Sequence, residues 1–284
     1  MTSLGFSLQP HYSLPLEKVI ELLAVSGFSA VSPVWTPELD LNRLAASTAA
    51  HNMTIQSLHA PYDGIPRLWE PDTSDSVKAQ KNILRCVDDC AQLRVPVMVL
   101  HPWCGFIYTF SKDSLDFRFF DYLVDYAQQK GVAIALENLE GEEYLDALMS
   151  RYHDQPHIGF CWDSGHDHCY PHKLDYLSRF GDRLIMTHLN DNMGPREPSG
   201  LLSEYDDLHF LPYDGNIYWE QWLRKLKDAS RQAILNFELK VQSFSKAPAD
   251  LLYTQLPLEA YLKKAGDRAR QIGILYDKIM SENI

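Results

Sequence analysis

The sequence predicts an α/β protein that folds as a single (β/α)8 barrel over residues 1–284, with a helical extension at the C-terminus. Three observations favour this class. Short apolar runs alternate with longer segments of helical periodicity, as in parallel strands joined by helical crossovers. The runs are rich in Val, Ile and Leu, which is typical of strands buried on both faces. Finally, there are eight such units, and a barrel of this kind typically needs about 250 residues.

The apolar runs and periodic segments give the expected order of elements. Strands are expected at 4–8, 28–34, 53–59, 95–101, 132–137, 157–163, 183–188 and 232–238. Helices are expected at 15–27, 39–52, 75–94, 114–131, 141–152, 173–182, 217–230 and 258–279. The first helix shows the pattern well, because Val19, Leu22 and Leu23 share one face and Gly27 ends it. An open doubly wound sheet is the alternative, but no GxGxxG follows its first strand.

Charge and cysteine usage restrict the class of function. The formal net charge is -12, from 38 acidic and 26 basic residues, which disfavours a protein that binds nucleic acid through a basic face. The five cysteines show no CxxC spacing, so a reducing compartment is expected. Neither a signal peptide nor an apolar run of membrane-spanning length is apparent. These features predict a cytoplasmic protein.

Acidic and imidazole side chains end six consecutive predicted strands. These are His59, His101, Glu137, Asp163, His188 and Glu238. In a barrel the carboxyl ends of all strands meet at one mouth, so the six side chains should share a site. Carboxylates gathered in one pocket repel each other unless a cation neutralises them. A divalent metal is therefore expected, and oxygen and nitrogen donors without thiolate suit Mn²⁺ or Zn²⁺, with Mg²⁺ or Co²⁺ also possible.

The metal ligands are expected to be Glu137, Asp163, His188 and Glu238. The competing interpretation is structural: a histidine at a strand end is usually a hydrogen-bonded loop group, and Glu137 begins an acidic stretch that suits a helix start. The agreement of six strands favours the metal site. His166, beyond an expected turn at Gly165, can reach the same mouth.

A long loop after the seventh strand carries a second set of polar residues. Asp207 and His209 form a D-x-H pair in this loop, and long loops in compact domains tend to be functional. Aromatic residues near strand ends, Trp103 among them, are either core or flat walls for a sugar. No G-x-S-x-G elbow and no P-loop occurs, so serine hydrolysis and P-loop nucleotide chemistry are not indicated.

Seven short motifs carry a resemblance to a known family. They are LHAPY, LHPW, ALEN, WDSGH, THLND, DLHFLPYDGNI and NFELK, in order from residue 58 to residue 240. In this order and spacing the sequence resembles the xylose-isomerase-like barrel superfamily. That superfamily comprises sugar and sugar-phosphate isomerases and epimerases, with the endonuclease IV family of abasic-site nucleases as a branch.

The resemblance implies roles for particular residues. In epimerase-like members a Glu, Asp, His, Glu quartet holds one metal, and it falls on Glu137, Asp163, His188 and Glu238. A histidine that contacts the substrate falls on His166, and a second acid of some ketose epimerases falls on Glu143. The nuclease branch adds ligands that fall on His59, His101, His166, Asp207 and His209, so a cluster of more than one metal stays open. The N-terminal region and the acidic charge depart from the nuclease pattern.

The expected function is therefore a metal-dependent isomerase or epimerase. It would act on a sugar, a sugar phosphate or a polyol-derived keto compound, through an enediolate, with Glu137 and Glu238 transferring the proton. The other substrate contacts expected are His166, His59, His101, Trp103, Glu143 and Arg196. A phosphodiesterase acting on abasic DNA is the alternative, and a sugar-binding protein without catalysis is a third. The sequence leaves open which sugar is handled, the kind of isomerisation, the number of metal ions and whether the chain forms a homo-oligomer.

Overall fold

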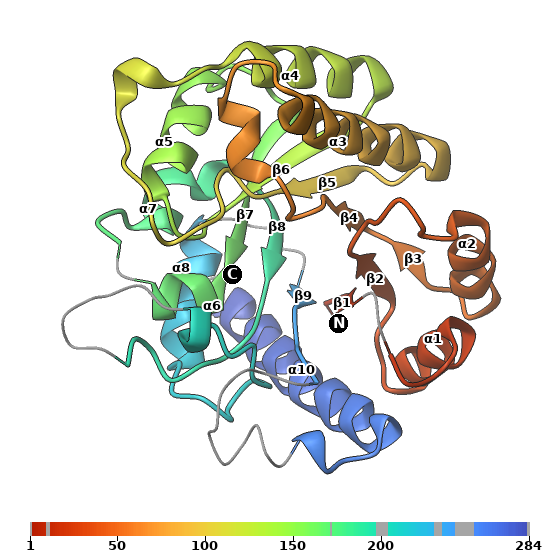
Figure 1. Ribbon diagram of the computed structural model, residues 1–284. Helices are drawn as coiled ribbons and strands as arrows, with labels where there is room; N and C mark the ends of the chain where they lie inside the picture. The colour runs from red at the N-terminus through yellow and green to blue at the C-terminus, as the bar shows by residue number, and fades with distance from the viewer. Residues whose placement is uncertain are drawn as a thin grey trace.

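The strands form a barrel of parallel strands with helices on its outside (Figure 1). The computed structural model describes residues 2–9, 12–170, 172–196, 204–229, 235–241 and 253–282. Two parallel sheets make up the barrel, in the orders β3-β2-β1-β9 and β4-β5-β6-β7-β8. Parallel bridges between Val34 and His59 and between Leu189 and Phe237 join the two sheets at both seams. The predicted barrel class is confirmed.

Every predicted strand is present, and one is divided. The strands are β1 (Leu4–Leu8), β2 (Ala30–Pro33), β3 (Thr54–Ile55), β4 (Ser57–His59), β5 (Val97–Leu100), β6 (Ala133–Glu137), β7 (Ile158–Asp163), β8 (Leu184–His188) and β9 (Leu235–Phe237). The third predicted strand is split at Gln56 because β3 pairs with β2 while β4 pairs with β5. The predicted start of the last strand, residues 232–234, lies outside the described residues.

The helices follow the predicted order with two differences after β7. The helices are α1 (Leu16–Val25), α2 (Leu41–Ala50), α3 (Ser74–Leu93), α4 (Arg118–Lys130), α5 (Glu142–Arg151), α6 (Ser164–Cys169), α7 (Tyr176–Phe180), α8 (Trp219–Ala229) and α10 (Leu258–Ser281). Short 3-10 turns are η1 (Ile65–Trp69), η2 (Lys112–Ser114), η3 (Gly181–Arg183) and η4 (Glu204–Asp206). The predicted helix at 173–182 is shorter and ends as a 3-10 turn, and α6 was not predicted.

Helix α6 begins directly at the end of β7, so the expected turn at Gly165 is wrong. The carboxylate of Asp163 accepts the backbone N–H of His166 at 2.7 Å, which caps the helix. Gly165 lies inside the helix and is needed for close packing, because a Cβ there would lie 1.8 Å from Oδ1 of Asn190. One carboxylate thus ends the strand and starts the helix.

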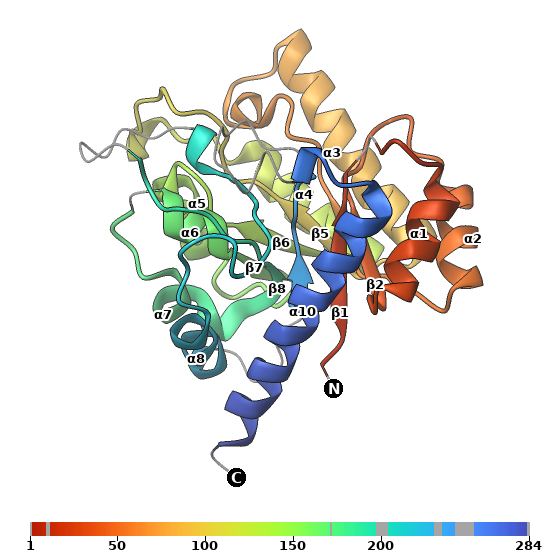
Figure 2. The same cartoon turned by 90° about the horizontal axis from the view of Figure 1, so that it is seen from below.

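The C-terminal helix α10 completes the outer ring of helices. It packs against α1, α8 and β1, and Figure 2 shows it running alongside β1. Gly266 allows the close approach, since a Cβ there would meet the carbonyl oxygen of Ser26 at 2.2 Å. Among the described residues, no helix is both long enough and apolar enough to cross a membrane.

The barrel interior is apolar on one side and polar on the other. Val97, Val99, Ala135, Cys161 and Met186 form a small buried cluster on β5 to β8, apart from the main core. The opposite wall is polar: Nε2 of Gln56 donates to Oδ1 of Asn236 at 2.6 Å, and Nδ2 of Asn236 donates to Oγ of Ser7 at 2.9 Å. Since side chains alternate along a strand, residues two positions beyond the interior cluster also face inward.

The polar wall leaves no room for a side chain at Gly5. A Cβ there would lie 2.0 Å from Nε2 of Gln56 and 2.8 Å from Oδ1 of Asn236. We expect Gly5→Ala to lower the free energy of unfolding by about 1–3 kcal/mol in urea denaturation, because overpacking forces the neighbours to shift. Adding Gln56→Ala should restore part of the loss. Strictly additive effects of the two substitutions would contradict this packing.

Candidate metal centre

Strand alternation directs three of the predicted ligands into the barrel mouth. Glu137, Asp163 and His188 each lie two positions beyond a residue of the interior cluster, and Glu238 follows β9. The four side chains are buried, and one potential ligand atom from each lies within 4.8 Å of the others. Nδ1 of His188 lies 3.0 Å from Oε1 of Glu137 and 2.7 Å from Oε2 of Glu238. The structure therefore brings the predicted quartet together.

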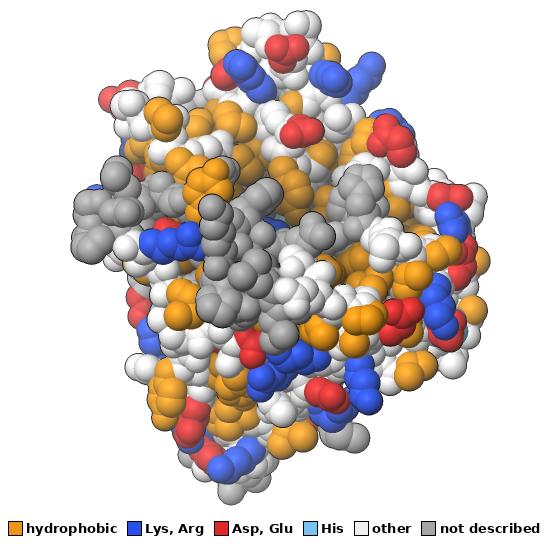
Figure 3. All heavy atoms as spheres, turned by 60° about the horizontal axis from the view of Figure 1, so that its bottom comes forward, with side chains coloured by type: hydrophobic (Ala, Val, Ile, Leu, Met, Phe, Trp, Pro, Cys, Tyr) orange, Lys and Arg blue, Asp and Glu red, His pale blue; other side chains and the backbone are white. Residues whose placement is uncertain are grey.

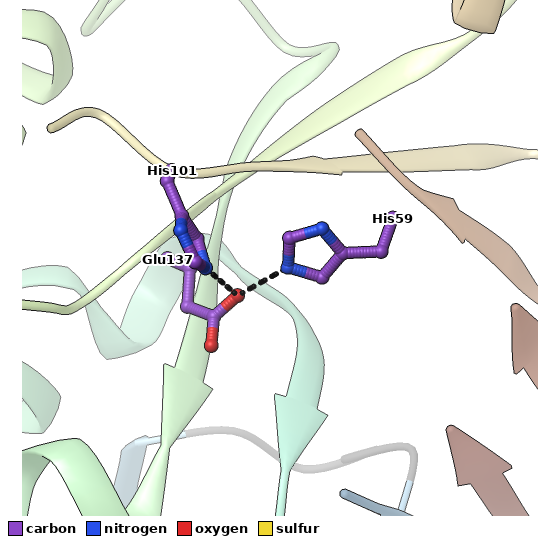
Figure 4. Close-up of side chains that lie close together, drawn as sticks. All are labelled: His59, His101 and Glu137. Atoms are coloured by element: carbon purple, nitrogen blue, oxygen red, sulfur yellow. Dashed lines mark hydrogen bonds and ion pairs between the residues drawn. The ribbon is translucent and has the colours of Figure 1, made fainter. Parts of the chain in front are cut away.

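A second group shares Glu137 with the quartet. His59 and His101 approach the same carboxylate oxygen, Oε2 of Glu137, from two sides (Figure 4). Their Nε2 atoms lie 3.1 Å and 3.3 Å from that oxygen. Because the other oxygen of Glu137 contacts His188, this carboxylate bridges the two groups.

A third group consists of His166, Asp207 and His209. Oδ2 of Asp207 lies 2.8 Å from Nε2 of His209 and 3.6 Å from Nε2 of His166. The Nδ1 atom of His166 lies 3.5 Å from Oε1 of Glu137, which connects this group to the quartet. All nine residues that the sequence proposes as metal ligands thus lie around one mouth.

Three of the histidines are oriented by main-chain carbonyl groups. Nδ1 of His59, His166 and His209 lies 2.7 Å, 3.0 Å and 2.9 Å from the carbonyl oxygens of Ala60, Asn138 and Glu238. Nδ1 must therefore carry the proton that it donates, so in a neutral ring Nε2 presents a lone pair. Each of these lone pairs faces a carboxylate, which is unfavourable without a cation between them. Histidines that bind metals are held by hydrogen bonds of this kind.

Burial and mutual charge shift the pKa values of these groups in opposite directions. Burial raises the pKa of Asp163 to about 6 and lowers that of His101 to about 4. Burial alone would raise the pKa of Glu137, but the charges of His188 and His101 outweigh it and lower that pKa. Burial would lower the pKa of His188, but the neighbouring groups, above all Cys161, Glu137 and Glu238, raise it.

The donor atoms fit a divalent metal of intermediate softness. Carboxylate oxygens and imidazole nitrogens predominate, a set that suits Zn²⁺, Mn²⁺ or Co²⁺. Nε2 of His101 is buried and lies 3.3 Å from Oε2 of Glu137 without the geometry of a hydrogen bond, and Oδ1 of Asp207 is buried without a hydrogen-bond partner. Both atoms belong to the groups described above. Cys161, which the sequence reasoning missed, lies within reach of Glu137 and His188. Burial raises the pKa of its thiol to about 12, so it stays protonated without a metal.

Asp191 holds the loop that carries the third group, and it was also missed. Its buried carboxylate accepts the backbone N–H groups of Asn192, Tyr213 and Ile217 and the indole N–H of Trp219, at 2.9–3.1 Å. The backbone of Asp191 also pairs with that of Phe210, next to His209. Asp191 lies three residues after the end of β8, and this position near the barrel mouth is the sequence signal that could have predicted its role.

Three predicted substrate contacts lie outside these groups. Glu143, on α5, accepts the hydroxyl of Tyr108 at 3.0 Å, and the ring of Trp103 stacks on Tyr144 with centroids 4.2 Å apart. Arg196 forms an ion pair of 3.2 Å with the buried Asp206 and donates to the carbonyl oxygen of Tyr205. Contact of Glu143, Trp103 or Arg196 with a substrate stays a prediction.

The sequence matches an established family over most of its length. The profile of the Xylose isomerase-like TIM barrel family matches residues 20–274, and the chain belongs to that family. The resemblance stated from the motifs is therefore confirmed at this level.

Two relatives and three solved structures extend the comparison. The uncharacterized protein y4fM of Sinorhizobium fredii is 34% identical over 164 residues, which are 54% of this chain and 49% of that protein. The uncharacterized protein MJ1311 of Methanocaldococcus jannaschii is 24% identical over 207 residues, 64% of each chain. The chain thus matches about half of the one relative and just under two thirds of the other.

The solved structures share the fold at low sequence identity. The IolI protein with a bound zinc atom has a TM-score of 0.74 and 19% identity, covering 99% of this chain and 100% of that one. D-allulose 3-epimerase from Methylomonas in complex with D-allulose has a TM-score of 0.73 and 16% identity, covering 97% of each. The 3-keto-D-glucoside 4-epimerase YcjR of E. coli has a TM-score of 0.64 and 15% identity, covering 93% and 100%.

The hydrogen bonds of Asp191 predict a large effect on stability. Asp191→Asn replaces an acceptor oxygen by an NH₂ group that faces buried N–H donors, so we expect a loss of roughly 2–4 kcal/mol in the free energy of unfolding. Urea denaturation of the metal-free protein measures it. The matched change Asp182→Asn, at an exposed residue of η3, should have little effect. Equal stabilities of the two variants would contradict this role for Asp191.

The raised pKa of His188 predicts that metal binding releases protons. In the metal-free protein the neighbouring groups raise the pKa of His188 against the effect of burial, so its imidazole holds a proton more strongly than a free histidine and must lose that proton to bind a metal. The affinity for Zn²⁺ should therefore rise with pH through the neutral range, about tenfold per pH unit for each proton released.

Calorimetry in buffers of different ionisation enthalpy measures this release. His172→Gln provides the control, since the pKa of His172 is raised to about 9 by its hydrogen bond to Asp167, against the effect of burial, and His172 lies outside the three groups. The variant should release the same number of protons as the wild type. A Zn²⁺ affinity that is constant between about pH 6.5 and 8 would refute the assignment.

Proposed function

We propose that this protein is a metal-dependent isomerase or epimerase of a sugar, a sugar phosphate or a related keto compound. The observation that carries the proposal is the quartet, in which Glu137 at the end of β6 and Glu238 just after β9 contact one buried imidazole, His188. The similarity to solved sugar epimerases supports it at the level of the fold. Glu137, Asp163, His188 and Glu238 would hold the ion, Mn²⁺ or Zn²⁺ in the first place.

The two glutamates differ in their surroundings, and this difference separates their roles. A divalent ion bound by the quartet would stabilise negative charge that develops on the substrate oxygens. Glu137 contacts histidines through both carboxylate oxygens, whereas Glu238 contacts His188 through Oε2. Glu238 is thus the better placed to take a proton from carbon through its other oxygen, and Glu137 chiefly holds the histidines in position.

The aromatic ring of Tyr62 lies at the entrance to this site. It packs against His59 and His101 with ring centroids 4.8 Å and 5.1 Å away, and the residue is 39% exposed. A partly exposed aromatic face beside polar ligands suits the apolar face of a sugar ring. His166, with its ring held by Asn138, would orient a substrate hydroxyl.

We further propose that the chain acts as a single barrel domain in a reducing compartment such as the cytoplasm. Helix α10 packs on α1 and β1 and thereby joins the last described part of the chain to the first. All five cysteines are free, as expected for reducing conditions.

A metal-dependent phosphodiesterase is the second candidate, favoured by one observation. Three adjacent groups of ligands, two of them sharing Glu137, resemble sites in which neighbouring ions activate water for attack on phosphate. Binding of a DNA strand also requires basic surface. On the face that Figure 3 shows, lysine and arginine side chains are scattered among acidic and hydrophobic ones, and the net charge is -12. The isomerase proposal is therefore the stronger.

Exchange of carbon-bound hydrogen with solvent tests the proposal without knowledge of the product. Incubation of the metal-loaded protein in D₂O with a panel of ketoses, aldoses and their phosphates should place deuterium next to the carbonyl of at least one compound, detected by NMR. We expect Glu238→Gln to slow this exchange by about 10²–10⁴-fold, the usual contribution of a general base. Metal content should be measured in parallel, because Glu238 is also a proposed ligand.

Glu220→Gln is the matched control, since Glu220 lies on α8 and pairs with Arg224 on the surface. Its exchange rate should equal that of the wild type. Incision of abasic-site DNA without any hydrogen exchange would contradict the isomerase proposal and support the phosphodiesterase. An unchanged exchange rate in Glu238→Gln would show that Glu238 is not the acid–base residue.

A further inference from the structure

The third group differs from the other two because a lysine lies beside it. Nζ of Lys240 lies 3.3 Å from Oδ2 of Asp207, the oxygen that also faces His209. The side chain of Lys240 is 30% exposed and that of Asp207 only 13%. In the described residues, the ion pairs of Glu137 and Glu238 are formed with histidines alone. Among the residues that the structure describes, a lysine ammonium group thus lies at the third group and at neither of the others.

The backbone fixes Lys240 beside this group. The N–H of Lys240 donates to the carbonyl oxygen of His209 at 3.2 Å, and Nδ1 of His209 donates to the carbonyl oxygen of Glu238 at 2.9 Å. One of these hydrogen bonds orients the ring of His209 toward Asp207, and the other fixes the backbone of Lys240 beside His209. This pairing places the backbone of Lys240 next to the third group, within reach of Asp207.

An ammonium group and a divalent ion compete for one carboxylate oxygen. Asp207 Oδ2 is the oxygen that faces both histidines, so an ion bound by all three residues would lie close to Nζ of Lys240. The repulsion between a monovalent and a divalent cation at such distances is strong in a buried site. Lysine already supplies the charge that Asp207 requires.

We propose that Lys240 takes the place of a metal ion at the group formed by His166, Asp207 and His209, so that the loaded protein holds no more than two ions. The inference rests on the metal dependence proposed above. It confines metal ions to the first two groups and leaves the third group with the positive charge of Lys240 in place of an ion. A three-ion hydrolytic centre is then excluded in this chain by a single side chain.

Removal of the positive charge of Lys240 should allow the third group to bind a metal ion. Wild-type protein and the variants Lys240→Met and Lys240→Arg are dialysed to equilibrium against buffered Zn²⁺, and bound zinc is measured by elemental analysis. We expect at most two equivalents in the wild type and in Lys240→Arg, and one additional equivalent in Lys240→Met. The added equivalent should be lost again in Lys240→Met/Asp207→Asn. The control Lys225→Met removes an exposed lysine of α8 that lies 4.0 Å from Asp175, and it should bind the same amount of zinc as the wild type.

The outcomes separate this inference from the proposal on which it rests. Three equivalents in the wild type, or equal numbers in the wild type and Lys240→Met, would overturn the role of Lys240 and leave the metal site standing. No bound zinc in any of the proteins would overturn both. Circular dichroism of each variant confirms that the comparison is made between folded proteins.

Discussion

The candidate metal centre depends on imidazole nitrogens that lie against buried carboxylates. His59 and His209 each donate a proton from Nδ1 to a main-chain carbonyl oxygen, and each directs Nε2 at a carboxylate oxygen about 3 Å away. A lone pair that faces a carboxylate is repulsive unless a proton or a metal ion lies between the partners or a nearby cation neutralises the carboxylate. The proposed metal dependence and the proposed role of Lys240 both follow from this requirement.

The barrel supplies this arrangement through strand alternation. Because Ala135, Cys161 and Met186 fill the interior of β6, β7 and β8, the side chains two positions further on must also point inward. Asp163 then caps α6 with the same carboxylate that ends β7, which places His166 at the mouth. The pieces of the site are thus positioned by the regular parts of the fold, and the third group is added by a loop that Asp191 holds.

The sequence predicted those features that follow from periodicity. Alternation of apolar runs and helical segments gave the barrel, and polar residues at strand ends gave six of the nine residues of the mouth. His166 followed from its position just past Asp163, and Asp207 and His209 from the long loop after the seventh predicted strand. Helix α6 was missed because a segment of polar residues and one glycine shows no helical pattern, and its formation depends on Asp163 as a cap. Cys161 and Lys240 were missed because their significance depends on distances across the barrel. Glu143, which the resemblance implied as a substrate contact, lies on α5 with its carboxylate accepting the hydroxyl of Tyr108, and its contact with a substrate stays a prediction.

Anomalous diffraction from crystals of the zinc-loaded protein, recorded on both sides of the zinc absorption edge, shows whether the quartet binds a metal ion. We expect an anomalous peak among the side chains of Glu137, Asp163, His188 and Glu238, at ordinary ligand distances of about 2.0–2.2 Å. Full loading with zinc bound elsewhere on the protein, and no peak among these four residues, would contradict it.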